Sequence, residues 1–307
     1  MKAPAGQRWR RNVVDAIGLV GLPLVAALLP WPVGFRLLGW LSRRGSFQHG
    51  AAEVAWSAAA PLLGAAAGRE ATFAQRFRLL RWVERCDTYL CVLRSERWWR
   101  RHIAVRGEWP AAGEACVLLT FHWGAAMWIW PVLRAQGIPA HFLARSPTAH
   151  DLGASRVSLW YAALRTRLLG RRGGLGAIFT GGSRARARAA LARGEGIVGM
   201  LDLPAQDGRA AAGVTLLGRP ARLPAGLAEL AIGAGARIAI FSGGVDGERG
   251  SRDLWVETLP RGADAGTVLE RYAAHLDRRL AEEPSAWQMW SESAAIFVPS
   301  DAPSRHA

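Results

Sequence analysis

His122 occupies a position where α/β proteins commonly place groups that carry out chemistry. It follows a short apolar run that ends in Thr120-Phe121, and it precedes Trp123-Gly124, where a helix is expected to begin. Polar side chains at the carboxyl end of a sheet strand, facing a helix start, are the usual place for binding and catalytic groups. A neutral imidazole there can accept the proton of a hydroxyl nucleophile as the hydroxyl attacks a thioester. The alternative is a hydrogen-bonded structural histidine.

The segments around His122 must form the frame that positions it. After Arg101, short apolar runs alternate with helical stretches. The expected strands are 102–106, 115–121, 140–144, 176–180, 197–202, 213–217, 237–242 and 253–258. The expected helices are 124–136, 153–169, 183–193, 224–234 and 265–283. This alternation predicts an α/β fold with a central, mostly parallel sheet flanked by helices.

Composition limits the classes of function that the chain can have. Half of the 307 residues are hydrophobic, and 39 basic residues against 24 acidic ones give a net charge of +15. Lys2 is the only lysine, so the charge comes almost entirely from arginine. The apolar content excludes a disordered or collagen-like chain, and 3 cysteines disfavour a disulfide-stapled secreted domain. Anionic lipid or an acidic carrier protein could use the charge; nucleic acid is not expected as a partner, because no recognition module appears.

The first 45 residues have the composition of a basic, hydrophobic membrane anchor. Residues 16–35 carry no charge, and arginines flank them on both sides. Twenty residues could just span a bilayer, although three prolines interrupt the stretch. We therefore expect an anchor that lies in, or just crosses, an anionic inner leaflet. The alternative is the buried first helix of a soluble protein.

Residues 46–300 are expected to form one unit, a helical region followed by the α/β part, with 301–307 as a frayed tail. Between Arg69 and Arg106 apolar residues recur near helical spacing and alternate with arginines, and three tryptophans, Trp82, Trp98 and Trp99, lie among them. Arginine and tryptophan on an amphipathic helix suit a headgroup surface. A solvated arginine face with tryptophans in the core explains the same pattern.

A second concentration of arginine lies between Leu152 and Gly194. Nine arginines occur there without a single acidic residue: Arg156, Arg165, Arg167, Arg171, Arg172, Arg184, Arg186, Arg188 and Arg193. The guanidinium fork matches phosphate and carboxylate geometry. We expect this run to receive an anionic headgroup or the acidic face of a carrier protein. A solvated helix is the plainer interpretation of part of it.

Several blocks of sequence, taken in order, resemble the bacterial lipid A late acyltransferases of the lysophospholipid acyltransferase superfamily. The resemblance covers about residues 100–293. The blocks are Thr120-Phe121-His122-Trp123-Gly124, Leu143-Ala144-Arg145, Gly196-Ile197-Val198-Gly199-Met200-Leu201-Asp202, Leu217-Gly218-Arg219-Pro220-Ala221 and Glu283-Pro284-Ser285-Ala286-Trp287-Gln288-Met289-Trp290.

The resemblance implies a membrane-associated O-acyltransferase at the cytoplasmic face of the bacterial inner membrane. It would move a fatty acyl group from acyl carrier protein or acyl-CoA to a hydroxyl of a lipid or glycolipid, as in lipid A biosynthesis. His122 would be the base and Arg145 a phosphate contact, with Arg156 and Arg219 as further substrate-binding residues; no cofactor or metal is expected. Acyl transfer in aryl-polyene or xanthomonadin-type pigment assembly is the alternative.

One departure from the family pattern concerns the orienting acid. The family signature places Asp or Glu five positions after the histidine, and that position here is Met127. The acid orients the imidazole and stabilises the imidazolium. Three explanations are open: a carboxylate from elsewhere, Asp202 or Asp207, replaces it; a backbone carbonyl orients the ring; or the protein binds acyl or lipid ligands without catalysis. Asp202 is the candidate catalytic partner of His122.

Overall fold

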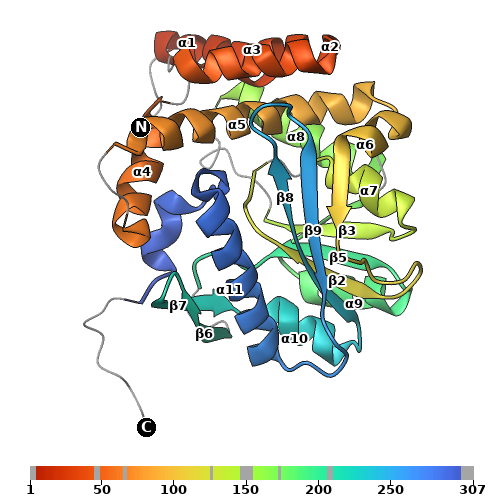
Figure 1. Cartoon of the computed structure of the whole chain (residues 1–307). Coiled ribbons are helices and arrows are strands. Elements are labelled where there is room, and N and C mark those ends of the chain that lie inside the picture. The colour runs from red at the N-terminus through yellow and green to blue at the C-terminus, as the bar shows by residue number, and fades with distance from the viewer. Residues whose placement is uncertain are drawn as a thin grey trace.

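The apolar runs that follow Arg101 build a seven-stranded sheet (Figure 1). His122 comes two residues after the end of β2, an interior strand of this sheet. A computed structural model describes residues 5–44, 49–64, 68–124, 127–145, 155–171, 174–205 and 210–298. The sheet has the order β1-β9-β8-β2-β5-β3-β4. Its strands are β1 (Ile103–Arg106), β2 (Cys116–Thr120), β3 (Ala140–Ala144), β4 (Gly174–Phe179), β5 (Gly196–Met200), β8 (Arg237–Val245) and β9 (Arg252–Thr258).

The sheet is mostly parallel, as predicted. Strands β8, β2, β5, β3 and β4 run in one direction, whereas β9 pairs antiparallel with β8 and β1 pairs parallel with β9. All five residues of β2 are buried. A fully apolar strand of this kind fits the middle of a sheet that is covered on both faces.

Helices flank the sheet. The connecting helices are α7 (Ile129–Ala135), α8 (Arg156–Arg171), α9 (Ser183–Ala192), α10 (Gly226–Gly233) and α11 (Ala265–Glu282). Before the sheet come α4 (His49–Leu63), α5 (Glu70–Leu93) and α6 (Glu96–His102), and after α11 come the 3₁₀ segments η2 (Pro284–Ala286) and η3 (Trp290–Ala295). Asp264 caps α11 by accepting a hydrogen bond from the backbone N–H of Thr267 at 2.7 Å.

One expected sheet strand lies elsewhere. The apolar run 213–217 falls in β6 (Ala211–Leu216), which pairs antiparallel with β7 (Arg219–Pro224) in a separate hairpin. Its placement in the central sheet was therefore wrong, and β7 was not expected. The turn residues Leu217 and Gly218 have φ values of 52° and 69°, as a two-residue hairpin turn requires. The helix expected over 124–136 begins only at Ile129.

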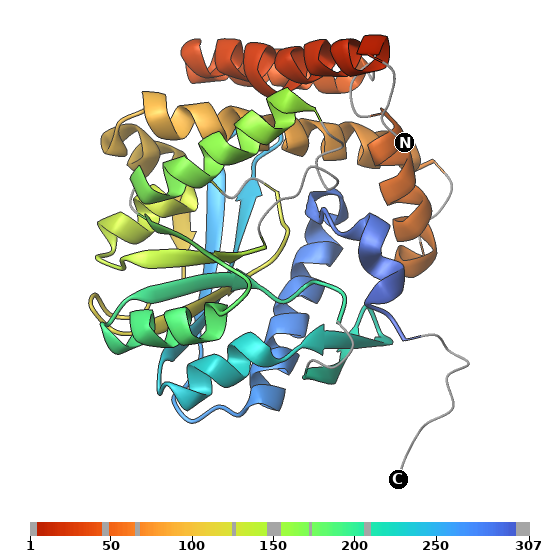
Figure 2. The ribbon, with the colours of Figure 1, turned by 180° about the vertical axis from the view of Figure 1, so that it is seen from behind.

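The N-terminal segment folds as a hairpin of helices instead of one straight helix. The π-helical segment η1 (Ala16–Gly21) joins α1 (Ala5–Asp15) to α2 (Leu22–Leu28), and α3 (Trp31–Arg44) follows. Leu29 is extended and ends α2, so the chain reverses within the uncharged stretch. The helices lie side by side across one end of the molecule, over α5 (Figures 1 and 2).

Candidate functional site

The register between β2 and β5 brings His122 next to Asp202. Thr120 pairs with Met200 at the carboxyl ends of these parallel strands, so the residues two positions further on lie side by side. The Nδ1 atom of His122 lies 2.9 Å from Oδ1 of Asp202. The backbone N–H of His122 also donates to Oδ2 at 2.8 Å. Both residues stand at the carboxyl edge of the sheet, where sites of this architecture form.

The carboxylate of Asp202 is buried, and N–H groups surround it. Its side chain has no exposed surface. Besides His122, the indole N–H of Trp287 donates to Oδ2 at 2.9 Å. A buried carboxylate needs such donors because it has lost its water. The same donors fix the direction in which the carboxylate points.

The hydrogen bond to Asp202 decides which nitrogen of His122 can act as a base. An ionised carboxylate only accepts hydrogen bonds, so Nδ1 carries the proton and Nε2 keeps the lone pair of the neutral ring. No hydrogen bond from the described part of the chain reaches Nε2. Burial alone would lower the pKa of His122, but the charge and hydrogen bond of Asp202, aided by Glu84 and Glu292, outweigh it and raise the pKa. The ring is therefore a strengthened base with a fixed orientation.

Tyr272 holds the two strand ends together beneath the histidine. Its hydroxyl accepts from the backbone N–H groups of Leu201 and Asp202, each at 3.0 Å, and donates to the carbonyl of Thr120 at 2.7 Å. Burial, with Asp202 as a second cause, raises the pKa of Tyr272 well above its usual value. The phenol consequently stays protonated and remains a donor at neutral pH.

The segment after α11 lies along the histidine loop like a short strand. Trp287 forms an antiparallel bridge with Trp123. The backbone N–H of Gln288 donates to the carbonyl of His122 at 2.8 Å, and its side-chain amide donates to the carbonyl of Gly124 at 2.7 Å. Gln288 thus holds the backbone carbonyl of His122, in addition to the bond from its N–H to Asp202, and this limits the movement of the loop.

A second charged group, Glu84 of α5, supports Gln288. The carboxylate of Glu84 accepts from the Gln288 amide at 3.1 Å and pairs with Arg165 of α8 at 2.9 Å. Burial alone would raise the pKa of Glu84, whereas Arg165 and Arg81 outweigh burial and hold the pKa below its usual value. The ionised Glu84 adds to the negative potential that raises the pKa of His122.

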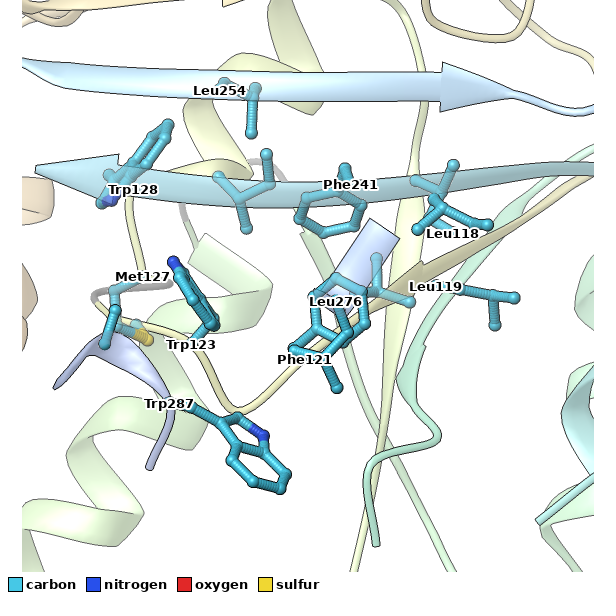
Figure 3. Close-up of a cluster of buried hydrophobic side chains, with 14 of the residues drawn as sticks. Leu118, Leu119, Phe121, Trp123, Met127, Trp128, Phe241, Leu254, Leu276 and Trp287 are labelled. Carbon is cyan, nitrogen blue, oxygen red and sulfur yellow. The ribbon is translucent and has the colours of Figure 1, made fainter. Parts of the chain in front are cut away.

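Met127, at the position where the family pattern expects an acid, is a core residue. Its side chain is only 5% exposed. Figure 3 shows it beside Trp123, in the apolar cluster that also includes Trp128 and Trp287. A carboxylate at this place would lie among apolar side chains. The carboxylate next to the imidazole belongs to Asp202, which follows the neighbouring strand β5; this agrees with the first of the three explanations. Asp207 lies outside the described residues.

The three arginines predicted to bind substrate lie in different parts of the fold. Arg145 follows β3, whose neighbour is β5, so it stands at the same sheet edge as Asp202. Arg156 begins α8, and its backbone N–H donates to Asn12 of α1 at 2.9 Å. Arg219 lies in the β6–β7 hairpin and donates to the carbonyl of Pro61 at 3.2 Å. Of the three, Arg145 is the one that follows a strand paired with β5, and its role in binding remains a prediction.

The acid-free arginine run is not a single surface. Arg165 pairs with Glu84, and Arg193 makes two hydrogen bonds to Glu195. Arg186 donates to the carbonyls of Phe179 and Gly181. Part of the run therefore serves contacts within the protein, and this reduces the positive charge available for a ligand.

A second histidine with polar neighbours is closed off from substrate. The Nε2 atom of His275 lies 2.8 Å from the hydroxyl of Ser242, and Glu257 lies 3.7 Å from Nδ1. Ser242 is 0% and His275 4% exposed, so the serine cannot meet a substrate. Burial, followed by Arg278, lowers the pKa of His275 to about 4. The neutral ring serves packing.

Other features of the described surface lie away from His122. A hollow lined by residues such as Glu108, Glu114 and Arg237 lies where β2 and β8 begin, at the edge opposite the histidine. Among the described residues, no group of three His, Cys, Asp or Glu side chains could hold a metal ion.

The supporting residues Tyr272, Trp287, Gln288 and Glu84 were not predicted. Each lies far from His122 in the sequence, and none follows a local spacing rule. The last sequence block of the resemblance, residues 283–290, includes Trp287 and Gln288, but the sequence assigned these two residues no role. Only the strand register and the packing of α5 and α11 reveal what these side chains touch.

No protein-family model matches the chain, and no curated protein matches it. The site itself must therefore carry the argument for function.

Proposed function

We propose that the protein is a membrane-associated O-acyltransferase in which His122 is the general base. The observation that carries this proposal is the hydrogen bond between Nδ1 of His122 and buried Asp202 at the carboxyl edge of the sheet. This pair leaves Nε2 free to accept a proton, and the carboxylate stabilises the imidazolium that results. The block order around His122 that resembles the lipid A late acyltransferases supports the choice of acyl transfer.

In the proposed reaction, Nε2 of His122 takes the proton of an acceptor hydroxyl while the oxygen attacks the thioester carbonyl. The tetrahedral intermediate collapses, the carbon–sulfur bond breaks, and the imidazolium of His122 gives its proton to the leaving thiolate, which returns the ring to its neutral form. The products are an ester and a free thiol. The proposed transfer moves one proton and includes no redox step, and the proposal assigns no metal or organic cofactor.

The proposed donor is acyl carrier protein or acyl-CoA, and the proposed acceptor is a lipid or glycolipid hydroxyl at the cytoplasmic face of the inner membrane. Lipid A intermediates are the leading acceptor, and the acceptors of aryl-polyene or xanthomonadin-type pigment assembly are the second. Arg145 is the proposed contact for an anionic group on the acceptor, because its strand ends beside that of Asp202.

The alternative hypothesis is an acyl- or lipid-binding protein without catalysis. It was suggested by Met127, which stands where the resembled family has an acid. The contact between Asp202 and His122 supports the catalytic proposal over this alternative, since the imidazole has a carboxylate partner.

Purified full-length protein tests the proposal when it is incubated with acyl-thioesters of different chain length, on carrier protein or CoA, and with candidate hydroxyl acceptors. Released thiol is measured continuously, and mass spectrometry identifies the ester. We expect turnover that depends on both donor and acceptor. Thiol release that never yields an acylated acceptor would contradict acyl transfer.

A further inference from the structure

The outer face of the N-terminal hairpin, residues 5–44, exposes many large apolar side chains. Trp9 is 68% exposed and Leu28 61%. Large exposed apolar surfaces on folded proteins mark interaction sites. The helices that carry these side chains lie side by side at one end of the molecule (Figures 1 and 2). The exposed apolar residues of the hairpin are Trp9, Val13, Val14, Ile17, Val25, Leu28, Val33 and Trp40.

The charge on the hairpin is almost entirely positive. Asp15 is the only acidic residue between positions 5 and 44. The guanidinium of Arg44 lies over the ring of Trp40, 4.5 Å from its centroid. Arginine beside tryptophan suits the level of lipid headgroups, where the cation meets phosphate and the indole sits in the interface. The exposed arginines are Arg10, Arg11, Arg36, Arg43 and Arg44.

The same charge argues against a second copy of the chain as the occupant. Two hairpins face to face would bring arginines toward arginines without matching acids, and like charges across an interface are costly. An anionic bilayer offers both phosphate groups and an apolar layer, so it complements the whole face.

The inner face of the hairpin is tied to the rest of the protein. Arg85 and Tyr89 of α5, with Arg94 just after it, donate to backbone carbonyls of η1 and α2, at Gly18, Leu19 and Ala27, over 2.7–3.1 Å. The indole of Trp31 donates to the carbonyl of Gly250 at 3.0 Å. These bonds hold both arms of the hairpin against the α/β part.

These ties are incompatible with a helix that crosses a bilayer. The helix Trp9–Leu28 is long and apolar enough to do so by length and composition. To span, it would have to release the hydrogen bonds from α5 or draw the arginines Arg85 and Arg94 into hydrocarbon, where charged side chains are costly.

We infer that the hairpin 5–44 lies in the plane of an anionic membrane surface and does not span it. Its apolar face enters the interface, its exposed arginines contact anionic headgroups, and the α/β part and the N-terminus stay on the same side. This inference does not depend on acyl transfer, and its tests require no enzymatic activity.

Labelling with a membrane-impermeant maleimide tests the topology. Gly6 precedes the apolar helix and Gly213 lies in β6; both are exposed, and a Cβ at either would meet nothing within 4 Å. The three native cysteines are buried. In sealed vesicles of known orientation, Gly6→Cys and Gly213→Cys should be labelled from the same side. Labelling from opposite sides would show a spanning helix and overturn the inference.

Flotation with lipid vesicles tests the chemistry of the partner. We expect the full chain to bind vesicles that contain phosphatidylglycerol about tenfold or more tightly than pure phosphatidylcholine, with binding weakened by salt. The double variant Val14→Glu/Ile17→Glu should lose about tenfold in binding, because it places charge on the apolar face. The matched control Val105→Glu/Ile232→Glu changes exposed apolar residues outside the hairpin and should bind as the parent does.

Two results would contradict the anionic surface. Equal binding to neutral and anionic vesicles would show that anionic headgroups are not recognised. An equal loss of vesicle binding in both double variants would show that the hairpin face is not the binding surface. A lipid-free dimer that Val14→Glu/Ile17→Glu dissociates would show that a second copy covers the face.

Discussion

At the scale of single residues, the acid that orients His122 comes from a different place than the family pattern expects. His122 was predicted because it follows an apolar run typical of a strand, and Asp202 was one of two carboxylates, with Asp207, proposed as its partner. Met127 instead fills the core beside Trp123. The rest of the site depends on tertiary contacts: Trp287 and Tyr272 reach Asp202 from the end of the chain, and no spacing in the sequence links them.

The pH dependence of Asp202→Asn tests this pair. The base form of His122 is lost as the pH falls through its pKa, which Asp202 raises. Removing the carboxylate leaves burial dominant, so the pKa should fall and the acid limb of kcat should move to lower pH. The maximal rate should fall by about 10³–10⁴-fold, as for loss of a triad acid.

The variant Glu195→Gln is a matched control, since Glu195 contacts another histidine, His141, at 3.2 Å. It should leave both the rate and the pH profile unchanged. An acid limb that stays in place in Asp202→Asn would show that Asp202 does not set the pKa of the catalytic group.

At the scale of elements, the sequence predicts strands and helices well where apolar runs are bounded by turns, and it fails at β7. That strand includes Pro220 and Pro224, which disfavour a sheet assignment. Its turn has Leu217 at a positive φ, where Asn or Gly is the usual signal. The N–H of Leu217 donates to Asp277 at 2.8 Å, a tertiary contact that helps to hold the turn.

The helical hairpin depends on a close approach at Gly34. A Cβ at this position would lie 2.2 Å from the carbonyl oxygen of Ala26, so α3 and α2 could not pack as they do. Gly34→Ala should lower the free energy of unfolding by about 1–3 kcal/mol. Gly39→Ala, in the same helix, meets only the end of Arg43 at 3.7 Å and should stabilise by up to about 1 kcal/mol. Equal melting temperatures for the two variants would contradict this packing.

At the scale of the whole molecule, a buried ion pair joins the helical part to the sheet. Arg252 of β9 pairs with Asp87 of α5, and both side chains are fully buried. The guanidinium also lies 4.6 Å from the ring centroid of Trp31 and 5.4 Å from that of Trp99. The hairpin, α5, α6 and the sheet therefore meet at one cation, and the sequence contains no sign of this convergence.

Breaking this ion pair should destabilise the protein. Asp87→Ala leaves a buried cation without its partner and should cost about 3–5 kcal/mol in the free energy of unfolding. The double variant Asp87→Leu/Arg252→Met should recover most of that loss, since it leaves no buried charge. Thermal or chemical denaturation measures both. A double variant as unstable as Asp87→Ala would show that the pair acts by more than charge compensation.

The most direct test of the proposed chemistry compares two histidines that each contact a carboxylate. His122 contacts Asp202 at the carboxyl end of the sheet. His141, which lies in β3, contacts Glu195. The measurement is the initial rate of ester formation from an acyl-thioester and a hydroxyl acceptor. His122→Gln should lower this rate by about 10²–10⁴-fold, the contribution of a general base, while His141→Gln keeps the parent rate. An unchanged rate in His122→Gln would contradict the central claim.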